Sequence, residues 1–259
     1  MKSMFTSTSL YIDLGTANTL IYARDKGLLI NEPSVVAIRH RGPRKELFAL
    51  GLPAKKMLGK TPSHLTVERP LKDGVISDFE ATSRMLHSFI QKIKVTLFWF
   101  RPEMIISLPC QVTSYEKKAV QEVGLEIGAR RVHLIDEPVC AAVGAGLNIT
   151  GKRGMMVVDI GGGTTEIVIL SCGGIIHSQA VRTGGNTIDS AIINHLQFQK
   201  KFLVGEQTAE RIKIEIGTAS PSSFERSTIV AGIDLRTGMP SRIQLSSTDV
   251  FQAIDPTIH

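Results

Sequence analysis

Apolar positions recur along the chain with two spacings, one typical of strands and one typical of helices. The run MIISLP at 104–109 is continuous and short, which predicts a buried strand. Apolar residues at helical spacing, Ile188, Ile192, Ile193 and Leu196, predict a helix in the second part of 183–196, and another helix is expected over 204–217. A further helix is expected to begin at Ser246 or Ser247 near the end of the chain. Strands and helices mixed in this way indicate an α/β fold.

Two segments of the chain repeat one pattern. DLGTANTLIYARDKGLLI (13–30) and DIGGGTTEIVILSCGGII (159–176) align without a gap and agree at six of eighteen positions. In each copy an apolar strand ends in an aspartate, Asp13 or Asp159, turns on small residues and continues as a β-branched strand to a second turn that contains glycine. The pattern predicts a β-hairpin in each copy and therefore two related halves.

These hairpins are candidate phosphate sites. Residues without a Cβ let backbone N–H groups approach a phosphate closely, and threonine hydroxyls can add donors. The aspartate before each turn cannot bind phosphate directly, but it can hold water around a Mg²⁺ ion that does. A dinucleotide fingerprint is excluded, because the glycines lead into the strand-like run EIVIL and Glu166 stands where the third glycine belongs. A single Asp-x-Gly-Thr can be an ordinary turn; two copies in register favour the phosphate site.

Other candidate residues lie outside the repeat. Pro138 fits the first turn of a helix, which places Glu137 at a strand-to-helix corner where it could orient a water or merely start the helix. Two glycines, Gly184 and Gly185, come just before the helical pattern that begins at Ile188. In the next helix Glu210 and Lys213 share a face and Gly217 is the expected C-cap. Such a charged pair is an ordinary surface ion pair or a contact to ribose and base.

Composition narrows the function classes. The chain has 259 residues and a net charge of +6, spread over short clusters without a nucleic-acid motif, so nucleic acid is not an expected partner. No apolar stretch approaches the roughly 20 residues that cross a bilayer. The first nine residues lack the apolar core of a signal peptide, and three isolated cysteines suggest neither disulfides nor zinc. A reducing cytoplasm is the expected compartment.

One apolar tetrapeptide stands apart. Leu97, Phe98, Trp99 and Phe100 follow a predicted helix, ATSRMLHSFIQKI, and come just before Pro102 and the strand at 104–109. This position indicates a loop. Its side chains either tuck under the domain as a small satellite core or remain available for an apolar partner.

The motifs resemble the superfamily of actin, heat-shock chaperones and sugar kinases. Within it DLGTANTL, NEPSVVAI, GVISDF, DIGGGTTE and GEQTAERIKIEIG are similar, in the family's order, to the MreB family of bacterial actins, and the resemblance covers nearly the whole chain. It implies an actin-like ATPase fold of duplicated ribonuclease H-like domains. We expect domain I over 1–147, with a small inserted subdomain at about 34–75, and domain II over 148–259.

The resemblance also implies roles for the candidate residues. Asp13 and Asp159 would hold hydrated Mg²⁺, Glu137 would position the attacking water, and residues 97–100 would insert into the membrane. The phosphates of ATP would lie on Gly15, Thr16, Ala17, Asn18, Gly161, Gly162, Gly163, Thr164 and Thr165. The nucleoside would lie on Gly184, Gly185, Glu210 and Lys213.

The function implied by the family is slow ATP hydrolysis coupled to filament assembly. The filaments would lie on the inner face of the cell membrane, at the edge of the cytoplasm, and would organise the cell-wall elongation machinery that sets rod shape. The chain departs from the family at its end, because no third glycine-rich motif follows Gly163. We therefore expect domain II to be incomplete. Two alternatives stay open: a remnant that keeps the fold without ATP turnover, and a small-molecule kinase of the same superfamily.

Overall fold

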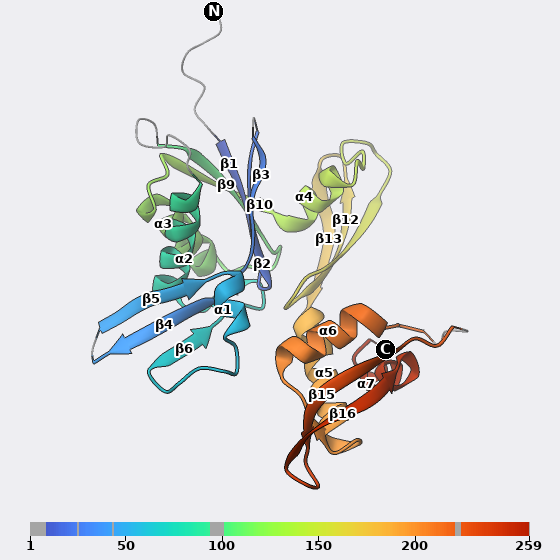
Figure 1. The fold of residues 1–259 in the computed structure, drawn as a ribbon. Helices are drawn as coiled ribbons and strands as arrows, with labels where there is room; N and C mark the ends of the chain where they lie inside the picture. Colours follow the sequence, from blue (N-terminus) through green and yellow to red (C-terminus); the bar gives the residue numbers. More distant parts are fainter. Residues whose placement is uncertain (1–8, 25, 43, 94–100, 221–223, 259) are drawn as a thin grey trace, which may run out of the picture. The chain divides into compact units, whose positions relative to one another are not determined.

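The computed structural model describes residues 9–24, 26–42, 44–93, 101–220 and 224–258. Contacts divide the chain into two compact units (Figure 1). Unit 1 comprises residues Met1–Met57 and Thr61–Arg182, and unit 2 comprises Leu58–Lys60 and Thr183–His259. The domain boundary at 147/148, which the family resemblance implies, stays a prediction.

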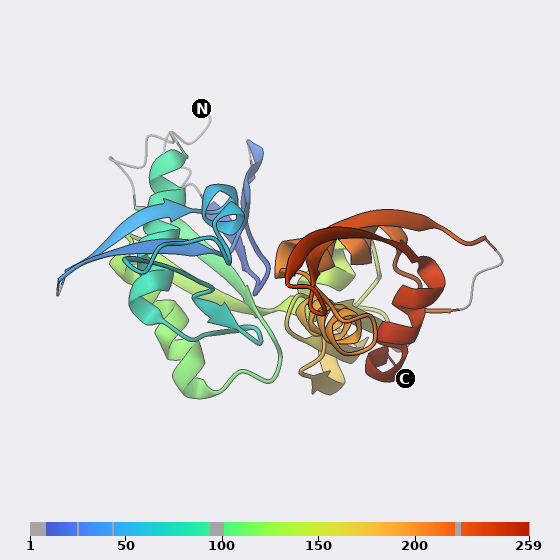
Figure 2. The same ribbon diagram turned by 60° about the horizontal axis from the view of Figure 1, so that its bottom comes forward.

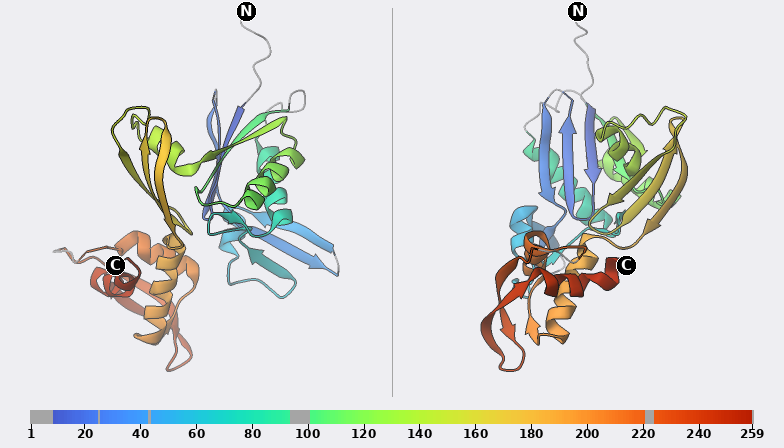
Figure 3. Two further views of the ribbon diagram at one scale, coloured as in Figure 1. Left: turned by 180° about the vertical axis from the view of Figure 1, so that it is seen from behind. Right: turned by 90° about the vertical axis from the view of Figure 1, so that its right-hand side faces the viewer.

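A five-stranded sheet forms the centre of unit 1. Its order is β10-β9-β1-β2-β3, in which β10, β9 and β1 run parallel and β1, β2 and β3 run antiparallel (Figure 3). The strands are β1 (Ser9–Leu14), β2 (Asn18–Ala23), β3 (Gly27–Pro33), β9 (Glu103–Leu108) and β10 (Arg131–Asp136). The strand predicted from MIISLP is therefore confirmed as β9.

Helices α2 (Phe79–Lys92) and α3 (Ser114–Glu126) pack together beside this sheet (Figure 1). The Asp78 carboxylate caps α2 by accepting the Ala81 N–H at 2.8 Å, and Thr113 and Glu116 form a capping box at α3. Alternate residues of β1, such as Leu10 and Ile12, are buried against apolar residues of α2 and β9. This core fixes the sheet edge at which the first aspartate lies.

A smaller sheet follows β3 in the chain. It has the order β5-β4-β6, with strands β4 (Val36–Arg41), β5 (Arg44–Leu50) and β6 (Leu65–Glu68), and the short helix α1 (Leu52–Lys56) follows β5. A two-stranded ribbon, β7 (Leu71–Lys72) and β8 (Val75–Ile76), comes next and turns at Asp73 and Gly74. These elements occupy the span predicted as an inserted subdomain, whose boundaries stay a prediction.

The second copy of the repeat forms a three-stranded antiparallel sheet in unit 1. Its strands are β11 (Met155–Ile160), β12 (Thr165–Ser171) and β13 (Gly174–Val181), and helix α4 (Glu137–Gly144) packs on it through Ala142. Both predicted hairpins are confirmed as β1–β2 and β11–β12. The second turns correspond as well, because Gly27 and Gly173 both adopt left-handed φ angles, 76° and 78°.

Unit 2 contains the last three helices and a three-stranded sheet of order β14-β15-β16 (Figure 2). Its elements are α5 (Gly185–Phe198), β14 (Phe202–Leu203), α6 (Glu206–Ile216), β15 (Ser227–Asp234), β16 (Met239–Ser246) and α7 (Ser247–Ile258). The three predicted helices are thus confirmed, and their apolar faces form a separate core that includes Ile192, Leu196 and Val250.

The ends of two helices show how local sequence sets the boundaries. Ser246 caps α7, since its hydroxyl accepts the Asp249 N–H at 3.2 Å and the Asp249 carboxylate accepts the Ser246 N–H at 3.1 Å. Gly217 is the C-cap of α6 with a φ of −61°, so it is not left-handed. Glycine is needed there for another reason, because a Cβ would lie 2.4 Å from the Lys213 carbonyl oxygen. Among the described helices none is long and apolar enough to span a bilayer.

Candidate functional site

The two repeated hairpins line one pocket of about 270 Å³ within unit 1. Both aspartates and Glu137 face it, together with Leu14, Leu20, Gly74, Ile160 and the predicted phosphate-binding residues Gly15, Thr16, Ala17, Asn18, Gly161, Gly162, Gly163 and Thr164. Thr165, which was also predicted to bind phosphate, is the first residue of β12 and does not belong to this lining. The structure therefore brings the two halves of the sequence repeat together.

The glycines in these turns are required by close approach. A Cβ at Gly15 would lie 2.8 Å from the Asn18 carbonyl oxygen. In the other turn, a Cβ at Gly162 would lie 2.7 Å from the Cβ of Ala17, which belongs to the first hairpin. Because carbon atoms pack at about 3.5–4.0 Å, the two turns abut too closely for a side chain at position 162.

A third turn, which the sequence analysis did not assign to the site, supports the first hairpin. The N–H of Gly74, between β7 and β8, donates to the Thr16 hydroxyl oxygen at 2.8 Å. That bond uses Thr16 as an acceptor and leaves its own proton to donate. The backbone of Asp73 lies beside Gly163, where a Cβ would be 3.0 Å from the Asp73 Cα. The motif GVISDF contained this turn, but no local signal connected it to the hairpins.

Asp13 is held at the end of β1 by its neighbour on β9. The Ser107 hydroxyl, opposite Asp13 in the parallel register, donates to the Asp13 carboxylate at 3.2 Å. Burial raises the pKa of Asp13, the bond from Ser107 lowers it, and the nearby Asp159 carboxylate raises it again. The two aspartates thus repel each other across the pocket.

Glu137 lies at the corner that the sequence predicts. It is the first residue of α4, directly after β10, and Pro138 follows in the first turn. Burial raises the pKa of Glu137 to about 8, with further increases from Asp13, Asp159 and Glu166. A carboxyl with this pKa changes charge near neutral pH, which suits an exchange of protons with water.

The donor set fits a hydrated divalent cation. Several carboxylates converge on the pocket, and burial together with mutual repulsion raises the pKa of both Asp13 and Glu137. A hard cation such as Mg²⁺ prefers oxygen ligands, keeps several waters and would offset this repulsion. Asp13 and Asp159 are the penultimate residues of β1 and β11, the strands that lead into the two hairpin turns.

The predicted nucleoside residues lie in unit 2. Gly184 and Gly185 begin α5, and Lys213 of α6 reaches back to that end of the helix. Its ammonium donates to the Gly185 carbonyl oxygen at 2.9 Å and pairs with Asp189 at 2.8 Å. Lys213 therefore links α6 to the start of α5.

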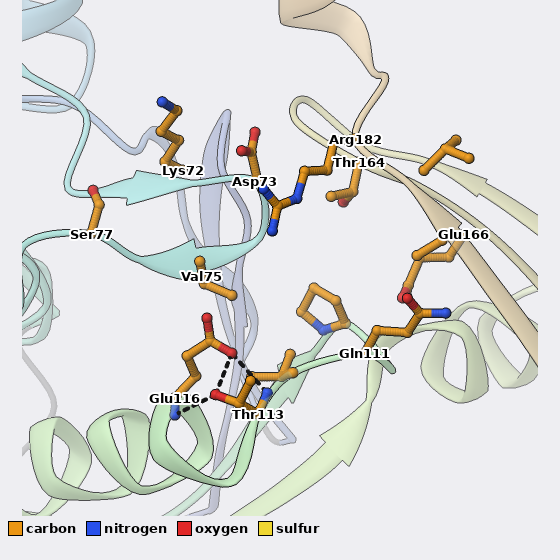
Figure 4. Close-up of a pocket in the computed structure, with 14 residues that line it drawn as sticks. Lys72, Asp73, Val75, Ser77, Gln111, Thr113, Glu116, Thr164, Glu166 and Arg182 are labelled. Carbon is orange, nitrogen blue, oxygen red and sulfur yellow. Dashed lines mark hydrogen bonds between the residues drawn. The ribbon is translucent and has the colours of Figure 1, made fainter.

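Two other features complete the comparison with the sequence. The predicted membrane residues Leu97, Phe98, Trp99 and Phe100 lie outside the described residues. The structure also has a second pocket in unit 1, of about 420 Å³, on whose wall Thr164 and Glu166 lie (Figure 4). In the sequence Glu166 only breaks a dinucleotide fingerprint, and no local signal places it in this wall.

Known proteins resemble this chain in both sequence and fold. The family model described as MreB/Mbl protein matches residues 7–259. The cell shape-determining protein MreB of Escherichia coli strain K12 is 46% identical over 256 residues, which cover 98% of this chain and 74% of that protein.

Among solved structures, MreB5 of Spiroplasma citri bound to AMPPNP is 34% identical, with a TM-score of 0.92 over 98% of this chain and 75% of that one. A MamK double helical filament is 20% identical, with a TM-score of 0.76 over 96% of this chain and 75% of that one, and this likeness concerns the fold alone. The fold is therefore actin-like, and the chain belongs to the MreB/Mbl family.

Proposed function

We propose that this chain is an actin-like cell-shape protein that binds Mg-ATP in the first pocket and hydrolyses it slowly. The observation that carries the proposal is the meeting of two aspartate-headed hairpins and Glu137 around one pocket of unit 1. A relative of the same family, MreB5 of Spiroplasma citri, has been solved with AMPPNP, which supports a nucleoside triphosphate as the ligand.

The phosphates would lie against the two turns. Their glycines allow backbone N–H groups to approach anionic oxygens, and the hydroxyls of Thr16 and Thr164 line the same pocket. Asp13 and Asp159 would hold the waters around Mg²⁺, which neutralises phosphate charge when it is bound. On the nucleoside side we propose Gly184, Gly185, Glu210 and Lys213.

We assign to Glu137 the role of orienting the attacking water. Phosphoryl transfer to water needs a correctly placed nucleophile more than covalent help from the protein. Glu137 extends from a rigid corner between β10 and α4, and Pro138 restricts the backbone there. Its carboxylate can accept a hydrogen bond from a water near the γ-phosphate and so direct the oxygen lone pair.

Self-association and membrane attachment complete the proposal. Filaments are proposed because the family shares the actin-like fold, and their partners would be further copies of this chain and the cell-wall elongation machinery. Attachment to the inner membrane face would use residues 97–100, with roughly 1.5–3 kcal/mol for each large side chain that leaves water. Lys92, Lys94 and Arg101 flank these residues in the sequence, and each cation adds about 1 kcal/mol near anionic lipid.

Steady-state ATP hydrolysis tests the proposal with Glu137→Gln as the variant. Gln keeps the size of the side chain but cannot take up a proton, so we expect Mg-ATP binding to persist while turnover falls by roughly 10²–10⁴-fold. Glu122→Gln is the matched control, since Glu122 is an exposed residue of α3 that pairs only loosely with Lys118 at 3.9 Å. Turnover that is equal in the wild type and in Glu137→Gln would remove Glu137 from the mechanism. Binding without turnover in the wild type would favour a nucleotide-binding remnant.

A further inference from the structure

Glu166 is a buried acid directly opposite a site aspartate. In the antiparallel register of β11 and β12, Glu166 pairs with Asp159, so the two side chains emerge on the same face of the sheet. Only 4% of Glu166 is exposed. Like charges at directly opposed positions destabilise a sheet, and a buried carboxylate adds a desolvation cost. A favourable contact of Glu166 must therefore offset the repulsion and the desolvation.

That contact joins the five-stranded sheet of unit 1 to the β11-β12-β13 sheet. One carboxylate oxygen of Glu166, Oε1, accepts the backbone N–H of Cys110 at 2.8 Å. Cys110 lies two residues beyond the end of β9, the strand whose Ser107 donates to Asp13 at 3.2 Å. A continuous series of contacts therefore runs from Asp13 through β9 to Glu166, and from Glu166 across one strand pair to Asp159.

The other carboxylate oxygen of Glu166 gains no hydrogen bond from the described residues. Oε2 is buried and has no hydrogen-bond partner among the described residues. Glu166 lies on the wall of the second pocket near Gln111 (Figure 4). Oε1 therefore has a donor and Oε2 has none among the described residues, so the bond from the Cys110 N–H orients the carboxylate.

We propose that Glu166 is a positioning residue that sets the spacing between Asp13 and Asp159 through its bond to the Cys110 N–H. The inference rests on the proposed function, because the two aspartates are assigned there to one hydrated Mg²⁺ ion. An ion shared by both aspartates depends on the distance between their carboxylates. A change in that distance therefore weakens the binding of Mg²⁺ more than the binding of the nucleotide without Mg²⁺. Glu166 touches neither ion nor nucleotide in this account.

Two substitutions separate the bond from the charge. Glu166→Ala removes the acceptor and leaves the Cys110 N–H unsatisfied, whereas Glu166→Gln keeps an acceptor oxygen and removes the negative charge. ATP binding to the full chain is measured by calorimetry at a series of Mg²⁺ concentrations and in EDTA. We expect Glu166→Ala to raise the Mg²⁺ concentration for half-maximal binding by roughly tenfold to a hundredfold, with ATP affinity in EDTA unchanged. Glu166→Gln should stay near the wild type.

A control distinguishes positioning from general loss of stability. Glu126→Ala removes another carboxylate hydrogen bond of unit 1, at an exposed residue: the Glu126 carboxylate accepts the Ser83 hydroxyl at 2.9 Å and joins α3 to α2. It should lower the unfolding temperature without changing the Mg²⁺ requirement. A folded Glu166→Ala with the wild-type Mg²⁺ requirement would overturn the inference, and so would a Glu166→Gln variant as impaired as Glu166→Ala. If the wild type binds no Mg-ATP, the proposed function fails instead.

Discussion

The contact between the two hairpin turns predicts that position 162 tolerates only glycine. A Cβ at Gly162 would lie 2.7 Å from the Cβ of Ala17 and 3.2 Å from the Ala17 backbone nitrogen. Since carbon atoms pack at about 3.5–4.0 Å, an alanine there would force the turns apart by about 1 Å. Overpacking of this kind typically costs about 1–3 kcal/mol. Gly162→Ala should therefore destabilise unit 1 and displace the second hairpin from the phosphates.

Thermal unfolding and calorimetric titration with Mg-ATP measure both effects. A domain of 150–250 residues loses roughly 2–4 °C per kcal/mol, and a loss of about 1.4 kcal/mol in binding is a tenfold loss of affinity. Gly154→Ala is the matched control, because its Cβ would meet only the Ile169 side chain at 3.6 Å, an ordinary contact. Gly154→Ala should leave stability and binding unchanged or slightly improved. If Gly162→Ala behaves like this control, the turns do not abut and the shared phosphate site is wrong.

Three further predictions concern the pH dependence of stability, the ion pair of Lys213 and the tetrapeptide at 97–100. The pKa of Glu137 rises from 4.5 to about 8 in the folded chain, so without Mg²⁺ the free energy of unfolding should fall as the pH rises between these values. Urea unfolding midpoints measure this fall, and Glu137→Gln should reduce it. Lys213→Met leaves Asp189 without its 2.8 Å ion pair and should cost about 1–3 kcal/mol in chemical unfolding, whereas Lys118→Met, at an exposed 3.9 Å pair, should cost under about 1 kcal/mol. Replacing residues 97–100 by Ser should abolish co-sedimentation with anionic vesicles; unchanged sedimentation would leave those side chains without a membrane role.

Local sequence patterns predicted the two hairpins, one strand-to-helix corner and the start of one helix. The duplicated aspartate-glycine segments predicted both hairpins, and Pro138 predicted the corner that carries Glu137. The cap at Ser246 predicted the start of the last described helix. In each case neighbouring residues determine the backbone, so the sequence signal is local.

Contacts between distant segments could not be read in this way. The bond from Gly74 to Thr16 joins residues 58 apart, and the bond from Cys110 to Glu166 joins residues 56 apart. The spacing along α6 predicts an ion pair between Lys213 and Glu210. Packing of α6 on α5 brings Lys213 to Asp189. Sequence spacing is silent about such pairs, because tertiary packing decides them.

The most direct test of the account is calorimetric titration of the 259-residue chain with Mg-ATP, beside Asp13→Asn and Asp159→Asn. Each variant keeps the shape of the side chain and removes one of the charges assigned to the hydrated ion. The account predicts saturable binding by the wild type and a loss of roughly tenfold to a hundredfold in both variants, with binding in EDTA little changed. A folded wild type that does not bind Mg-ATP, or variants that bind it as tightly as the wild type, would contradict the account.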